Sequence, residues 1–319
     1  MATQWLRRGW LAACASALLL VACGGGDIVD PFSPARVVTF GDAMADLGQN
    51  GSRYTVNDGT LNVWTEAVSV QYGLTTAPSS TGGFAYATGN ARVAARPDAA
   101  GSNATPTVKE QIDTFLATGT LGDDDLILIS AGTSDVIAEA QKVITGAQSE
   151  DQMLDALGQA GRALGAQVKR LVDAGALHVV VAGPYNLGRS PWAFQVNQGS
   201  LLESASSRFN QQFLIYIKDL GENVLYVDAA LYFNQVTGNP AAYDLNELSP
   251  TAVVCTSVDP GPGIGTGSGE VNSNLCTPNT LAAGREDYTR YVFADRVYPT
   301  PRGHQLFGDY VYDRIKERF

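Results

Sequence analysis

The chain has few residues of the types that bind metal ions or attract nucleic acids. Its 319 residues include 4 cysteines and only 2 histidines, His178 and His304. The pair Cys255 and Cys276 and the sequence near it offer too few ligands for a metal site, so we expect no metal and no cofactor. Lysine and arginine number 21 against 32 acidic residues, a formal net charge of −11. Because an acidic protein repels phosphate backbones, we expect no nucleic-acid partner.

The start of the chain has the pattern of an export signal. Arg7 and Arg8 precede an apolar stretch that ends near residue 21 and is too short for a good membrane span. We therefore assign residues 1–22 to a signal peptide. Its end, Leu-Val-Ala-Cys, resembles a bacterial lipobox, which would make Cys23 the lipidated first residue of the mature protein. A plain signal peptide cleaved elsewhere is the alternative.

Lipidation at Cys23 predicts a protein held on a membrane without spanning it, because several acyl chains anchor far more firmly than one. Gly24 in place of aspartate resembles the sorting pattern of Gram-negative outer-membrane lipoproteins, with the side of that membrane left open. Residues 23–35 carry glycines and two prolines and are expected to form a flexible tether. In an exported chain the isolated pair Cys255 and Cys276 indicates a disulfide.

Residues 36–319 are predicted to form one domain, since no second boundary stands out and 45% hydrophobic residues allow a sizeable core. Apolar runs alternate with amphipathic helical patterns. This alternation predicts an α/β fold with a mainly parallel central sheet between two layers of helices. We expect strands at 36–40, 125–130, 177–182 and 223–228, and helices at 62–72, 107–116, 151–173 and 200–220.

Four motifs, in order, resemble those of the SGNH (GDSL) hydrolases. Gly-Asp-Ala-Met at 41–44 is similar to block I, where Gly-Asp-Ser-Leu carries the nucleophilic serine. Residues 82–93 are similar to the glycine-rich block II, and Ala-Gly-Thr-Ser-Asp at 131–135 to block III, Gly-x-Asn-Asp. Residues 293–304 are similar to block V, Asp-x-x-His-Pro-Thr. The resemblance covers about residue 36 to the end and implies a flavodoxin-like three-layer sandwich and a lipase or esterase.

The reacting groups of that family are replaced here. Ala43 stands at the nucleophile position and Tyr298 at the base position, while Asp295 matches the triad acid. A phenol with a usual pKa near ~10 is neutral at pH 7 and a poor proton acceptor. Ser134 replaces the oxyanion asparagine with a shorter and less directed donor. The resemblance implies oxyanion-hole positions at Ala43, Gly89, Asn90 and Ser134.

These replacements predict that ester hydrolysis is weak or lost. In subtilisin, removing the serine or the histidine alone lowers turnover by roughly 2 × 10⁶, about as much as removing the whole triad. We therefore interpret the chain as an impaired enzyme or pseudoenzyme that binds an acyl ester, a lipid or an acylated glycan. Two alternatives stay open: an active ester hydrolase that uses Ser134 or His304 as a non-standard nucleophile or base, and a purely structural envelope lipoprotein.

Overall fold

A computed structural model of the chain describes residues 32–60 and 63–319. The predicted signal peptide, Cys23 and most of the predicted tether lie outside the described residues. The chain divides into the units Met1–Phe32 and Ser33–Phe319, and every described strand and helix belongs to the second unit. Among the residues that the structure describes, no helix combines the length and the apolar character needed to cross a membrane.

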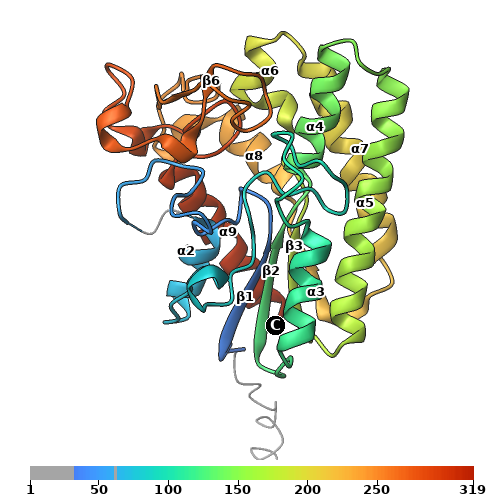
Figure 1. Ribbon diagram of the computed structural model, residues 1–319. Helices are drawn as coiled ribbons and strands as arrows, with labels where there is room; N and C mark the ends of the chain where they lie inside the picture. The colour runs from blue at the N-terminus through green and yellow to red at the C-terminus, as the bar shows by residue number, and fades with distance from the viewer. Residues whose placement is uncertain (1–31, 61–62) are drawn as a thin grey trace, which may run out of the picture. The chain divides into compact units, whose positions relative to one another are not determined.

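A parallel sheet of four strands forms the centre of the fold (Figure 1). The first three strands are apolar and nearly fully buried, as expected of strands covered on both faces, while the edge strand Val224–Tyr226 is half-buried. Their register places Thr39 beside Leu128 and Leu128 beside Val180. In spatial order they are β1 (Arg36–Gly41), β2 (Asp125–Ser130), β3 (His178–Ala182) and β4 (Val224–Tyr226).

A short fifth segment extends the sheet beyond β1. The Thr39 N–H donates to the Phe84 carbonyl at 3.0 Å, and the Tyr86 N–H donates to the Thr39 carbonyl at 2.7 Å. The result is a parallel bridge between Thr39 and Ala85. Counted with this segment, the strand order becomes 2-1-3-4-5 in chain numbering, which is the flavodoxin-like order. The predicted α/β fold with a parallel sheet is confirmed.

Helices cover both faces of the sheet (Figure 1). Helices α3, α5 and α7 pack against one another on one face, and α2 packs with α9 on the other. This arrangement follows from right-handed crossovers between parallel strands. The bounds are α2 (Trp64–Gln71), α3 (Val108–Thr118), α4 (Thr133–Ile144), α5 (Glu150–Asp173), α6 (Pro191–Gln195), α7 (Gly199–Ile217), α8 (Ala229–Gly238) and α9 (Pro301–Arg318).

Several helices begin where the sequence supplies an N-terminal cap. The Thr107 side chain accepts the Glu110 N–H at the start of α3, and Ser149 accepts the Gln152 N–H at the start of α5. Thr300 accepts the Gly303 N–H and Pro301 opens α9, which fixes the direction of the chain as it leaves block V. Local chemistry thus sets where the helices begin around the sheet.

Gly41 is required where β1 meets β2. Its φ is 145°, and a Cβ added there would overlap the Ser130 carbonyl oxygen. We expect Gly41→Ala to lower the free energy of unfolding by more than about 3 kcal/mol, because the overlap falls on backbone inside the sheet. Urea unfolding followed by circular dichroism measures the change.

Gly238→Ala is the matched control, since a Cβ there meets no atom within 4 Å and should shift stability by less than about 0.5 kcal/mol. Equal unfolding midpoints for the two variants would show that β1 and β2 do not approach as closely as described.

Candidate functional site

The four sequence-assigned site positions Ala43, Ser134, Asp295 and Tyr298 come from three separate parts of the chain. Ala43 lies just after β1, Ser134 lies in the first turn of α4 after β2, and the other two lie in the turn before α9. The structure brings them together, because the Tyr298 phenol is close enough to Asp295, Ser134 and Asp42 for each to shift its pKa. The carboxyl ends of parallel strands meet at one edge of a sheet, which is why the site forms there.

This group is closed to solvent. Ala43 is 1% exposed, and Ser134, Asp295 and Tyr298 are each 0% exposed. The hydroxyl oxygens of Ser134 and Tyr298 make no hydrogen bond with proper geometry to any residue that the structure describes. The site is therefore a buried cluster of polar side chains that is closed to bulk water.

Tyr298 is a neutral phenol at this position. Burial raises its pKa well above the usual value, and the Asp42 and Asp295 carboxylates raise it further. Because its pKa is so high, the phenol stays protonated at neutral pH. A protonated phenol has no basic site of useful strength. The position that the family resemblance assigns to the base therefore carries a neutral phenol.

Asp42 connects the end of β1 to the start of α4. Its Oδ1 accepts the Met44 N–H at 3.1 Å and its Oδ2 accepts the Ser134 N–H at 3.2 Å. Burial raises the pKa of Asp42 to about 7, against the opposing effect of these backbone donors. The Ser134 backbone donor is thus engaged by Asp42, and only its hydroxyl remains to face a ligand.

Two donors of block II are engaged within the protein. The Gly89 N–H donates to Asp46 Oδ2 at 2.8 Å. Asn90 has a φ of 63°, a left-handed geometry that asparagine tolerates, and its side-chain amide donates to the Gly263 carbonyl at 3.1 Å. Asp46 therefore holds the Gly89 N–H, one of the two block II donors that the family resemblance assigns to the oxyanion hole.

Tyr54 fills the space between block II and block V. A Cβ added at Gly89 would overlap the Tyr54 ring, so the glycine allows this close packing. The Tyr54 and Tyr298 rings meet edge to face with centroids 5.4 Å apart. Sequence analysis missed both Tyr54 and Asp46, because they lie in a loop with no periodic pattern and outside the matched motifs.

Asp295 is held by backbone donors. Its Oδ1 accepts the Val297 N–H at 2.8 Å and the Tyr298 N–H at 2.7 Å, while Oδ2 accepts the Ser273 N–H at 3.0 Å. Burial raises the pKa of Asp295 and these bonds oppose the rise. In this arrangement the carboxylate stabilises the block V turn and has no imidazole to orient.

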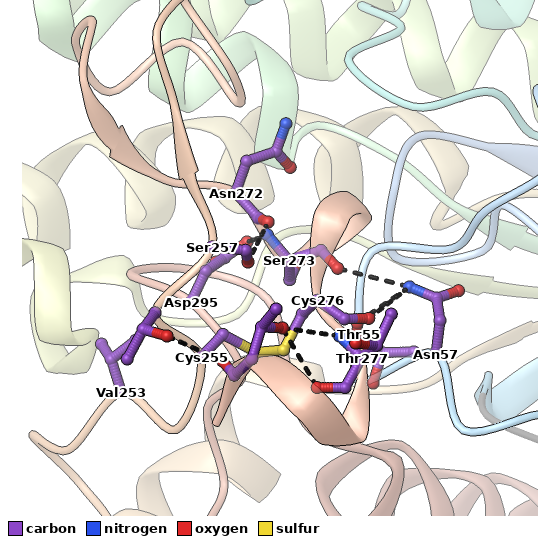
Figure 2. The surroundings of a disulfide bond; sticks show 12 residues. Thr55, Asn57, Val253, Cys255, Ser257, Asn272, Ser273, Cys276, Thr277 and Asp295 are labelled. Atoms are coloured by element: carbon purple, nitrogen blue, oxygen red, sulfur yellow. Dashed lines mark hydrogen bonds between the residues drawn. A yellow bond between two sulfur atoms is a disulfide. The ribbon is translucent and has the colours of Figure 1, made fainter. Parts of the chain in front are cut away.

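The loop enclosed by a disulfide bridges the site. Cys255 and Cys276 are joined with Cα atoms 5.8 Å apart, and Ser273 and Asp295 lie beside them (Figure 2). The same loop supplies Gly263, which accepts from Asn90. An ion pair of 3.0 Å between Glu270 in the loop and Arg296 in block V adds a third attachment. The loop thus joins block II to block V.

The alternative reacting groups have no suitable partners. His304 lies buried in the first turn of α9, and burial lowers its pKa to about 3. Neither of its ring nitrogens hydrogen-bonds with proper geometry to a described residue. His178 begins β3 and so lies at the opposite end of the strands from the site. Within the described residues, neither histidine is placed to act as a base for Ser134.

Sequence comparison shows the family of the chain. A profile of the GDSL-like Lipase/Acylhydrolase family matches residues 37–311, and the chain belongs to this family. An uncharacterized protein in the trpE-trpG intergenic region of Pseudomonas putida is 26% identical over 153 residues. The match covers 48% of this chain and 24% of that protein, so the chain spans about a quarter of the relative's length.

A solved crystal structure aligns with 89% of this chain and 98% of its own, at 10% identity and a TM-score of 0.42. At this level of similarity the alignment carries no argument about function.

Removing the disulfide should destabilise the protein. The cysteines are 21 residues apart, and closing a loop of that length contributes about 3 kcal/mol in the chain-entropy description. We expect the double variant Cys255→Ser with Cys276→Ser to lose about that free energy of unfolding, measured in urea without reductant. Reductant should shift the wild type toward the variant and leave the variant unchanged. A wild type insensitive to reductant after full reduction, checked by thiol titration, would contradict the prediction.

Asp42 should make stability fall as pH rises. Between its usual pKa and the folded value of about 7, the unfolded chain releases the Asp42 proton while the folded protein keeps it. The contribution of protonated Asp42 to the free energy of unfolding is therefore fully present below the usual carboxyl pKa. It is lost as the pH rises through about 7. We expect the stability of the wild type relative to Asp42→Asn to decrease by ~1 kcal/mol per pH unit in this interval.

Urea unfolding of both proteins from about pH 4 to 8 measures this difference. The matched control is Asp219→Asn, which makes the same chemical change at a side chain that is 83% exposed and far from the buried cluster in sequence. A pH-independent difference for Asp42→Asn would show that Asp42 ionises normally in the folded protein.

Proposed function

We propose that this member of the GDSL family does not hydrolyse esters and acts by binding, as a lipoprotein anchored to the outer membrane through Cys23. One observation carries the loss of hydrolysis: a neutral phenol, that of Tyr298, fills the base position beside Ala43, with both side chains sealed from solvent. Acyl-serine chemistry needs a nucleophile, a base within reach of it and free donors for the developing oxyanion. Here the first two requirements fail at Ala43 and Tyr298. The third is weakened, because the Gly89 N–H is bonded to Asp46 and a hydroxyl replaces the asparagine amide at Ser134.

The inherited ligand would be an acyl ester, a lipid or an acylated glycan. Such a ligand reaches the buried cluster only if the Tyr54 ring and the disulfide loop move apart, because both contact the block II residues that would face it. Binding at this site is therefore coupled to opening of that loop.

Hydrolysis through Ser134 or His304 is not favoured by the geometry. The pKa of His304 is too low for a base at neutral pH, and the Ser134 hydroxyl has no basic partner among the described residues. A serine hydroxyl is a weak nucleophile unless an adjacent base activates it.

Esterase assays of the full-length chain in detergent test the proposal. We expect the wild type to hydrolyse p-nitrophenyl acetate and p-nitrophenyl palmitate no faster than the Ser134→Ala variant. The double variant Ala43→Ser with Tyr298→His restores nucleophile and base and should gain turnover. Adding Ser134→Asn restores the amide donor and should increase turnover further, by up to ~10²–10³.

A fluorophosphonate probe followed by mass spectrometry gives a second readout. We expect labelling at residue 43 in the double variant and no labelled serine in the wild type. Wild-type turnover lost on His304→Ala, with the fold intact by circular dichroism, or a labelled Ser134, would overturn the proposal.

A further inference from the structure

We propose that a pocket at the outer edge of the sheet, separate from the buried cluster, binds a neutral saccharide. This edge pocket has a volume of about 620 Å³ and is formed by the turn at 49–50, the segment 79–88 beside β1, and α3. Small-molecule sites fall in the range of ~300–1,000 Å³. The inference does not depend on whether the buried cluster hydrolyses esters.

The edge pocket is attached to the same strand as the buried cluster. Gln111 of α3 lines it and bonds the backbone of Gly41 twice, donating from Nε2 to the carbonyl and accepting the N–H at Oε1, each at 2.9 Å. Thr88, another lining residue, donates its N–H to the Gly41 carbonyl at 3.1 Å. The edge pocket therefore adjoins the end of β1. Gln111 and Thr88 lie between the pocket and the start of the buried cluster at residue 42.

All twelve residues that line the edge pocket are uncharged, although the chain has a net charge of −11. The charges nearby are neutralised elsewhere. Arg36 bonds Asp125 at 2.9 Å, Glu110 pairs with Arg96 at 2.7 Å, and Asp113 pairs with Lys109 at 2.6 Å. An anionic ligand would find no cation in the lining and a cationic ligand no carboxylate. The lining is therefore complementary to a neutral ligand.

The polar groups of the lining are amides and hydroxyls held in place by internal bonds. Gln49 accepts the Ser80 N–H at 3.1 Å and donates to Ser79 Oγ at 3.1 Å. Ser80 Oγ in turn donates to the Gln49 carbonyl at 3.1 Å, and the Asn50 side chain next to it is exposed. The oxygens of these fixed hydroxyl and amide groups can accept further hydrogen bonds from ligand hydroxyls with little ordering cost.

Two aromatic side chains supply the apolar part of the lining. Phe84 is 39% exposed, yet the Arg36 guanidinium lies over its ring at 4.5 Å and holds it in place. Tyr86 stacks on Phe40 at 5.6 Å. A fixed and partly exposed ring beside hydroxyls and amides suits a ligand with both C–H faces and hydroxyl edges, which describes a sugar ring. An acyl chain would instead displace water from the lining hydroxyls and amides without forming hydrogen bonds to them.

Saccharide titration of the full-length chain tests the proposal, in a detergent without a sugar headgroup. The probes are chitotriose, maltotriose and cellotriose, with trigalacturonate as the anionic control and octanoate as the acyl control. We expect saturable binding of at least one neutral trisaccharide by calorimetry, with saturation-transfer NMR showing contact through its C–H groups. Neither control should bind as tightly.

Phe84→Ala should weaken this binding about two- to tenfold, the range expected for loss of one aromatic contact. Phe84→Tyr keeps the ring and should retain affinity, which separates loss of the ring from loss of the fold. Phe194→Ala is the matched control, since Phe194 is 71% exposed and lies outside the pocket lining. Absence of binding to all three sugars up to millimolar concentration, equal affinity in Phe84→Ala, or tighter binding of either control would overturn the proposal.

Discussion

The buried carboxylate of Asp42 is the constraint on which the site depends. It accepts backbone N–H groups from the turn after β1 and from the first turn of α4, and so fixes two segments that are far apart in sequence. Gly41 beside it lets the two strands approach. Because these are contacts of backbone and carboxylate, they persist whatever side chain follows at residue 43. The framework of a hydrolase and its reacting groups are thus physically separable in this chain.

The sequence predicts the fold well because the fold depends on local patterns. Apolar runs locate β1, β2 and β3, and helical spacing of apolar residues predicts starts at 107 and 151, each within one residue of the observed starts of α3 and α5. Helix α4 escaped prediction as an element, since it opens with Gly132, Thr133 and Ser134, residues more typical of turns. Its first turn forms because Asp42 accepts a backbone donor there.

The site is only partly predictable. Motif order locates the positions of Ala43, Ser134, Asp295 and Tyr298, and the sequence identifies each replacement directly. Their closure is not readable from the sequence, because it comes from Tyr54 and from the loop ending at Cys276. Those contacts join residues separated by tens to hundreds of positions, and their loops show no periodicity. The uncharged lining of the edge pocket is equally unpredictable from the sequence, since the residues that form it are scattered from residue 49 to residue 114.

The packing of Tyr54 against Gly89 has a consequence for affinity at the buried site. Because the Tyr54 ring belongs to the same chain, it competes intramolecularly with any ligand for the space beside Gly89. Any external molecule binds only the fraction of protein in which the ring has moved away, so its apparent dissociation constant equals the intrinsic constant divided by that fraction. The measured affinity would then be low even if the open site were chemically well suited to the ligand. Enlarging the open fraction would raise affinity without a single new contact to the ligand.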